Sequence, residues 1–181
     1  MTSGKKLLIV VAVQFLVLLS VIGFKQYTVW TGETVLLKTA PVDPQDLLRG
    51  DYVALRYEIS TIERSKFVDG EPYPDEEVFV ELQKGSDGYW NAVAVHQAQK
   101  SSYDGTVLIK GRVETAYPYS SSTPVTLHYG IEQVFVPDGS GGNLPSGSGH
   151  TVAVEVKVDR FGHAVPRRFF VDWQPFDLKR Q

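Results

Sequence analysis

The chain has 181 residues, no cysteine, and a formal net charge of −3 from 18 basic and 21 acidic side chains. No long run of one sign occurs, so the sequence lacks the basic stripe that would neutralise phosphates, which argues against nucleic acid as a partner. The absence of cysteine excludes disulfides, thiolate chemistry and cysteine-linked lipid anchors.

The first predicted element is an apolar helix at the N-terminus. Leu7–Phe24 is a run of 18 uncharged residues, which as a helix covers roughly 27 Å of a hydrocarbon core about 30 Å thick. We therefore expect residues 1–30 to form a membrane anchor that contacts the lipid bilayer through Leu7–Phe24. A cleaved signal peptide is the alternative, although its apolar region is normally shorter, about 7–15 residues.

The charges around this helix predict its orientation. Lys5 and Lys6 precede the apolar run together with the N-terminal amine, and Lys25 alone follows it closely. The positive-inside rule then favours a cytoplasmic N-terminus. We expect a single-pass protein of the bacterial inner (cytoplasmic) membrane, with residues 31–181 as a periplasmic or extracellular domain.

Residues 31–181 have the pattern of an all-β domain. Short segments rich in Val, Tyr and Phe alternate in polarity and are separated by Gly and Pro, as strands and turns require. In Thr151–Val158, for example, four valines share one face while Glu155 and Lys157 share the other. The predicted strands are 34–39, 51–59, 78–82, 89–95, 106–114, 125–136, 151–158 and 165–171. We predict an antiparallel barrel or sandwich.

The segments between these strands are predicted as turns and loops, and the turns at residues 84–88 and 159–162 are each expected to connect the two strands of a hairpin. Residues 40–50 contain one short helical turn, with Asp43 as its cap and Gly50 as its end. Residues 63–76 form a polar loop, and Gly130 marks a bulge or bend. Residues 138–150 are rich in Gly and Ser, which predicts a flexible loop rather than a ligand cradle.

Two strings resemble the signature of a known family. Gly50–Tyr57 reads GDYVALRY, and Tyr129–Gly139 reads YGIEQVFVPDG. Together they resemble the GDYXXLXY family of bacterial membrane-anchored proteins, although Asp138 stands where the family string has Glu. The Gly- and Ser-rich segment 140–149 also departs from the charged stretch that the family has there.

This resemblance implies an architecture and no activity. It implies a β domain held at a membrane, and it suggests a membrane-complex partner because some members are joined to multi-pass membrane domains. The family's function is unknown, so the resemblance identifies no substrate, cofactor or catalytic residue.

The first string has two interpretations. Alternation places Leu55 and Tyr57 on a core face and Tyr52 on the opposite face, which favours a role in maintaining the fold. A binding surface around Arg49, Asp51 and Tyr52 is the alternative. Including the second string, the candidate site residues are Arg49, Gly50, Asp51, Tyr52, Leu55, Tyr57, His128, Tyr129 and Glu132.

No enzymatic motif stands out. Residues 46–51 resemble the entry to signal-peptidase β domains, but the nucleophilic serine expected just upstream is missing. The four histidines lack metal-ligand spacing, and His128 with Tyr129 and Glu132 is the best local polar cluster. We expect no enzyme, no cofactor and no metal site.

Three functions stay open at this point. The first is a non-enzymatic binding or accessory subunit of an envelope complex, with another membrane protein as its partner. The second is a small-ligand or glycan binder that uses Arg49, Tyr52 and the 138–150 loop. The least favoured is an unrecognised hydrolase built on His128, Glu132 and Asp51.

Overall fold

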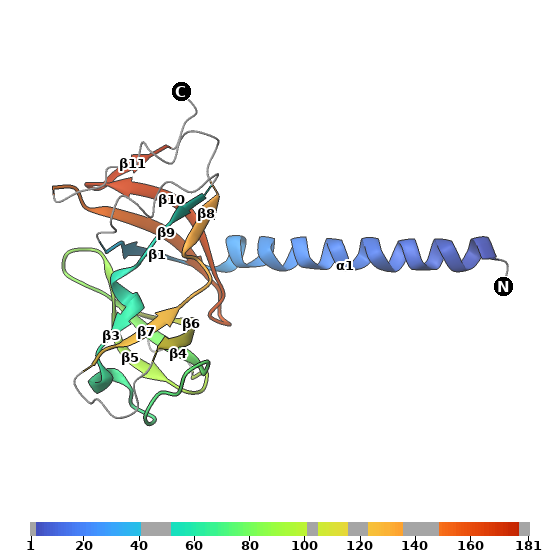
Figure 1. Cartoon of the computed structure of the whole chain (residues 1–181). Helices are drawn as coiled ribbons and strands as arrows, with labels where there is room; N and C mark the ends of the chain where they lie inside the picture. Colours follow the sequence, from blue (N-terminus) through green and yellow to red (C-terminus); the bar gives the residue numbers. More distant parts are fainter. Residues whose placement is uncertain (1–2, 41–51, 101–104, 116–122, 136–148, 178–181) are drawn as a thin grey trace.

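A long helix leads into a β-rich domain in the computed structural model of the chain (Figure 1). The structure describes residues 3–40, 52–100, 105–115, 123–135 and 149–177. The predicted turn at 40–50 lies outside these residues beyond Ala40, as does the Gly- and Ser-rich loop up to residue 148.

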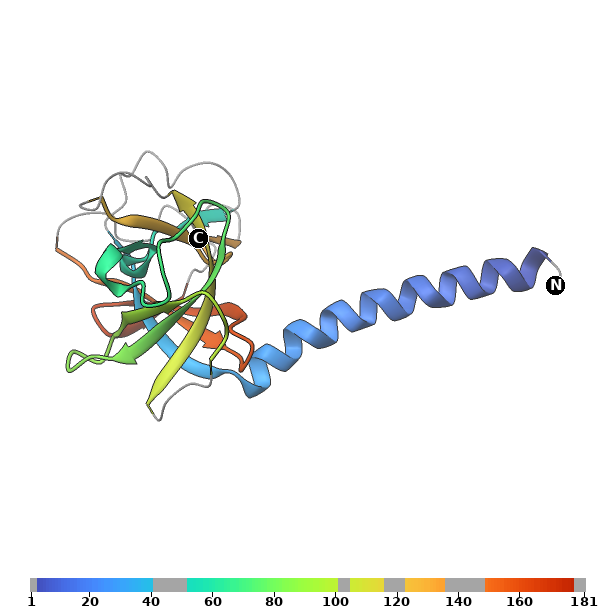
Figure 2. The same cartoon turned by 90° about the horizontal axis from the view of Figure 1, so that it is seen from below.

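Helix α1 (Ser3–Thr31) extends away from the domain (Figures 1 and 2). Its section Gly4–Thr31 is long and apolar enough to cross a membrane, and none of its most apolar stretch is buried among the described residues. Large side chains such as Leu16 and Ile22 are 69% and 64% exposed. The predicted N-terminal helix is confirmed, and it is a candidate membrane anchor.

The first sheet has the strand order β1-β9-β10-β11. Its strands are β1 (Glu33–Lys38), β9 (Val152–Val158), β10 (Ala164–Val171) and β11 (Gln174–Phe176). Strands β9 and β10 form the predicted last hairpin, and β1 pairs antiparallel with β9 so that Val35 lies opposite Val156. The strand that directly follows α1 is therefore joined to the C-terminal part of the chain.

The second sheet has the order β3-β7-β6-β4-β5, and a separate two-stranded ribbon pairs β2 with β8. The sheet consists of β3 (Thr61–Ile62), β4 (Glu77–Lys84), β5 (Trp90–His96), β6 (Thr106–Thr115) and β7 (Val125–His128), and the ribbon consists of β2 (Tyr52–Ala54) and β8 (Gln133–Phe135). Strands β4 and β5 are the predicted hairpin around residues 84–88. All pairings between these strands are antiparallel.

The core fills the space between the two larger sheets (Figure 1). Val154 and Val156 of β9 face it with no exposure, as do Val80 of β4 and Ile109 of β6. The predicted inward valines of 151–158 are all buried. The all-β prediction is confirmed, and because the sheets do not close on themselves the domain is sandwich-like rather than a barrel.

The prediction of one continuous strand over 51–59 is wrong. In its described part β2 pairs with β8, Tyr57 then forms an isolated bridge with Thr39 beyond the end of β1, and a 3-10 turn occupies Glu58–Ser60. The chain changes partners within a few residues, so no single ladder continues through it. The predicted strand 125–136 is likewise divided into β7 and β8 by the expected bend, where Gly130 has φ 75°.

The helix and the domain meet at a short, bonded junction. Gly32 alone separates α1 from β1, and its amide donates to the carbonyl of Thr28. The Thr28 hydroxyl donates to Asp159 Oδ2 over 2.7 Å, and Lys157 Nζ donates to the Gly32 carbonyl over 3.1 Å. A Cβ at Gly32 would overlap the Thr28 carbonyl, so glycine is required for this close turn.

Candidate functional site

The two signature strings lie side by side in the fold. Strand β2 from the first string and β8 from the second form the two-stranded ribbon, in which Val53 lies opposite Val134. Beyond the ribbon the Leu55 amide donates to the Glu132 carbonyl over 2.6 Å. Segments about 75 positions apart in the sequence therefore meet as one unit.

Two buried tyrosines connect these strings reciprocally. The Tyr57 hydroxyl donates to the Ile131 carbonyl over 2.9 Å, and the Tyr129 hydroxyl donates to the Ile59 carbonyl over 2.6 Å. Tyr57 is fully buried and Tyr129 is 8% exposed. Each ring packs in the core, and its hydroxyl bonds to a backbone carbonyl that has no partner in a regular strand pairing. We call this pair of reciprocal contacts the tyrosine clasp.

The environment keeps both hydroxyls protonated. Burial raises the pKa of Tyr57 and of Tyr129 well above the usual tyrosine range, and the nearby Glu132 charge raises both further. A protonated phenol donates one hydrogen bond, which is what each clasp contact needs. The clasp is therefore a structural device, and neither tyrosine is poised to act as a base or nucleophile.

Glu132 and His128 order the bend between β7 and β8. The Tyr129 amide donates to Glu132 Oε1, and the Gly130 amide donates to His128 Nδ1 over 3.2 Å. The His128 Nδ1 atom thus accepts, which places the ring proton of the neutral form on Nε2. That Nε2 atom lies 3.1 Å from Glu132 Oε2 without the alignment of a hydrogen bond.

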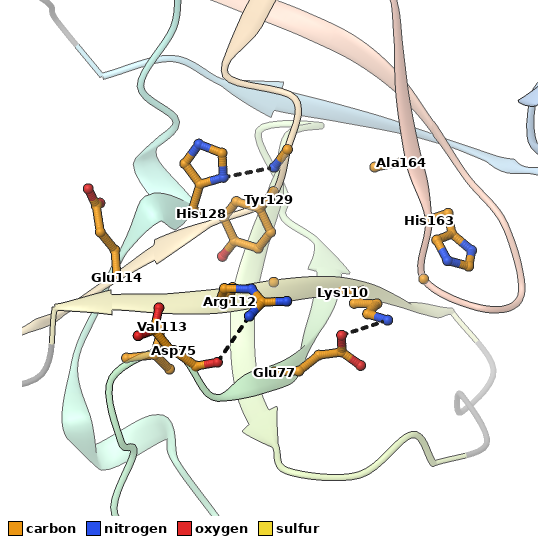
Figure 3. A pocket seen from close by; sticks show the side chains of 13 residues that line it. Asp75, Glu77, Lys110, Arg112, Val113, Glu114, His128, Tyr129, His163 and Ala164 are labelled. Carbon is orange, nitrogen blue, oxygen red and sulfur yellow. Dashed lines mark hydrogen bonds and ion pairs between the residues drawn. The ribbon is translucent and has the colours of Figure 1, made fainter.

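A cleft of about 530 Å³ opens beside Tyr129 (Figure 3). Residues 110–114 of β6 form one wall, and residues 162–164, where the β9–β10 turn enters β10, lie across from it. Gly111 leaves room for the Tyr129 ring beside the cleft, because a Cβ at position 111 would lie only 3.0 Å from Tyr129 Cε1.

The cleft carries charges of both signs. Lys110 Nζ lies 2.8 Å from Glu77 Oε2, and Arg112 donates to the Asp75 carbonyl over 3.4 Å (Figure 3). Both members of the Lys110–Glu77 pair are partly exposed, so water weakens their attraction and an incoming polar group could exchange with it. The arrangement suits a ligand or peptide that offers both donors and acceptors.

The structure brings together some of the predicted site residues and not others. Leu55 and Tyr57 lie in the core as expected, and His128, Tyr129 and Glu132 form one cluster. Tyr52 is placed by its backbone in β2. Arg49, Gly50 and Asp51 lie outside the described residues, so a binding surface around them stays a prediction.

Sequence reasoning missed the cationic wall of the cleft and its neighbour His163. Lys110 and Arg112 alternate with buried Ile109 and Val113 along β6, so the strand pattern itself places two cations on one face. His163 reaches the same cleft from the β9–β10 hairpin, and no local pattern connects it with β6.

Comparison with known proteins establishes the family of the chain. The family model described as "GDYXXLXY protein" matches residues 14–169, which covers most of the chain. The chain therefore belongs to the GDYXXLXY family. No curated protein and no solved structure matches the chain significantly.

Proposed function

We propose that this chain is a membrane-tethered accessory subunit, whose β domain binds another membrane protein of the bacterial envelope without catalysing a reaction. The observation that carries the proposal is the bonded junction between α1 and the domain. A protein that captures dispersed ligands gains reach from a flexible linker. This chain instead connects helix and domain through Gly32 alone.

The junction fixes the orientation of the domain on its helix. Thr28 bonds to Asp159 at the end of β9, and Lys157 bonds back to the Gly32 carbonyl. Lys157 belongs to β9 and Asp159 directly follows it, and β9 also pairs with β1 and β10. A partner that contacts both the helix and the domain would therefore meet a surface whose two parts are held in a fixed relative orientation. Such a surface suits a subunit of a complex.

The use of the polar residues supports a non-enzymatic role. Tyr57 and Tyr129 donate to backbone carbonyls. His128 accepts from the Gly130 amide, and Glu132 accepts from the Tyr129 amide. These groups already have structural partners, and a catalytic acid or base needs to be free to exchange a proton with its substrate.

In this proposal the N-terminus lies in the cytoplasm and the domain lies in the periplasm or outside the cell. Lys5 and Lys6 precede the apolar section of α1, which supports that direction by the positive-inside rule. The cytoplasmic membrane of a bacterium is the compartment that fits both features.

Co-purification from gently solubilised membranes tests the proposal. The tagged intact chain should bring down a multi-pass membrane protein in near-stoichiometric amount. Insertion of three Gly/Ser residues between Gly32 and Glu33 should reduce this recovery strongly, because the orientation is released. The same insertion after Ser86, in the exposed β4–β5 turn, is the matched control and should leave recovery unchanged. Purification of the chain alone would contradict the proposal.

A second candidate is a small-ligand or glycan binder, which the cleft beside Tyr129 favours. This cleft is lined by Lys110, Arg112 and His128, and therefore differs from the site expected around Arg49, Tyr52 and residues 138–150. Thermal-shift screening of envelope sugars and peptides would test it. A hit should raise the melting temperature of the wild-type chain and leave that of Lys110→Ala unchanged, whereas equal shifts in both would place binding elsewhere.

A further inference from the structure

The turn between β9 and β10 is tied directly to the membrane-proximal end of α1. The Asp159 side chain is fully buried, and its Oδ2 atom accepts the Thr28 hydroxyl. Its Oδ1 atom accepts the amides of Phe161 and His163 over 2.9 and 3.0 Å. One carboxylate thus holds the helix with one oxygen and shapes the turn with the other.

This connection sets the height of the turn above the membrane. Thr28 follows Phe24, the end of the apolar run, by four residues, which is about 6 Å along a helix. A bilayer about 40–45 Å thick with a core of about 30 Å has a headgroup layer of roughly that depth on each side. Figures 1 and 2 both place the β9–β10 turn beside this end of α1.

The turn presents a cation and an aromatic ring at that height. Phe161 is 38% exposed, and the Arg160 guanidinium lies over its ring at 4.7 Å. Among the described residues no carboxylate forms an ion pair with Arg160. An arginine beside an exposed aromatic ring is the composition that settles in a phospholipid headgroup layer.

A small hollow of about 200 Å³ lies next to the turn. Arg160 lines it beside Thr31 at the end of α1, and Glu33 and Asp159 contribute acidic groups. Lys100 also lines it, but its Nζ atom lies 3.0 Å from Asp69 Oδ1, so Arg160 is the cation left for an incoming anion.

We propose that the β9–β10 turn is an interfacial anchor, in which Phe161 enters the headgroup layer and Arg160 binds a phospholipid phosphate. The inference rests on the proposed membrane tether. It adds a second point of contact, so that the domain lies against the bilayer surface instead of standing clear of it.

Site-directed spin labelling of the intact chain in phospholipid nanodiscs tests this anchor, because the chain has no cysteine of its own. The same nitroxide is attached to Leu16→Cys, Phe161→Cys and Ser86→Cys in separate samples. Collision with oxygen and with a water-soluble nickel complex then reports the depth of each label. Ser86 belongs to the β4–β5 turn, which lies on the side of the domain away from α1 (Figure 2), and controls for the affinity of the label itself.

The expected result is a label at position 16 in the hydrocarbon core, one at 161 in the headgroup layer, and one at 86 in water. Accessibility to nickel at 161 should be several-fold lower than at 86. Equal accessibility at 161 and 86, with position 16 in the core, would overturn the interfacial anchor and leave the tether intact. An aqueous signal at position 16 would overturn the tether as well.

A second pair of variants tests the role of Arg160 in holding the turn at the headgroup layer. Arg160→Gln in the Phe161→Cys background should raise nickel accessibility at position 161, because the phosphate contact is lost. Arg167→Gln removes the same charge from β10 and should change nothing. An unchanged label depth in Arg160→Gln would overturn the phosphate contact.

Discussion

At the scale of single residues, the tyrosine clasp explains why tyrosine suits both Tyr57 and Tyr129 better than phenylalanine. Each ring could be replaced by a phenyl group of nearly the same volume. The carbonyls of Ile131 and Ile59 would then lose their donors in a buried setting. An unsatisfied buried carbonyl costs more than the net gain of an ordinary hydrogen bond.

Tyr57→Phe and Tyr129→Phe should each lower the free energy of unfolding by about 1–3 kcal/mol. The reason is the buried carbonyl that each substitution leaves unpaired. Urea unfolding of the intact chain in detergent, followed by tryptophan fluorescence, measures the change. Tyr73→Phe is the matched control, because Tyr73 is 64% exposed, and an equal loss there would contradict the clasp.

The clasp should also make the domain sensitive to alkaline pH. The pKa values of Tyr57 and Tyr129 are raised in the folded state above their ordinary value of 10.0. Their contribution is complete below pH 10 and is lost as pH rises further, because the unfolded chain releases protons that the folded chain retains. The unfolding free energy should fall above pH 10 by up to about 1.4 kcal/mol per pH unit for each tyrosine.

Denaturant titrations at a series of pH values from 9 upward would measure this slope. The Tyr57→Phe and Tyr129→Phe variants should each show a shallower decline than the wild type, since each lacks one of the shifted groups. Parallel slopes in all three chains would show that other groups, such as lysines, cause the alkaline loss.

At the scale of elements, the β9–β10 turn depends on a glycine that no other residue replaces easily. Gly162 has φ 84°, and a Cβ there would lie 2.9 Å from the Lys110 amide nitrogen. The Gly162 carbonyl accepts from that same amide. The turn is thereby attached to β6 of the opposite sheet as well as to α1.

Gly162→Ala should destabilise the domain more than Gly130→Ala. Gly130 has φ 75°, and a Cβ added there would meet open space. Its substitution should therefore lower the unfolding free energy only by the strain of a side chain in the left-handed conformation, about 1–2 kcal/mol. Gly162→Ala adds a steric clash to that cost. Comparison of the two unfolding free energies tests this order, and equal losses would contradict the close packing of the turn on β6.

Local alternation predicted most of the strands but not their breaks. The valines of 151–158 and the hairpin around residues 84–88 follow from period-two patterns and turn residues, and the structure confirms both. The break after Ala54 could not be predicted, because it depends on Thr39 and Glu132 as distant partners. The cleft was missed for the same reason, since His163 and Lys110 meet only in the folded chain.

At the scale of the whole molecule, the proposed orientation predicts which end of the chain a membrane-impermeant reagent reaches. Ser86→Cys gives a single thiol in an otherwise cysteine-free chain. A membrane-impermeant maleimide should label it in spheroplasts without lysis if the domain lies outside the cytoplasm. Labelling only after lysis would reverse the predicted orientation, and Gly4→Cys at the other end of α1 should show the opposite behaviour.

The single-residue connection at Gly32 also limits how the proposed accessory subunit could search for a partner. A domain on a long linker samples many tilts and rotations, and binding removes that freedom at a cost in entropy. Here the bonds from Thr28 and Lys157 remove most of it beforehand. In the proposed tethered state, the motions that remain are lateral diffusion and rotation about the helix axis. An encounter with a partner in the bilayer would then have to match only that rotation angle.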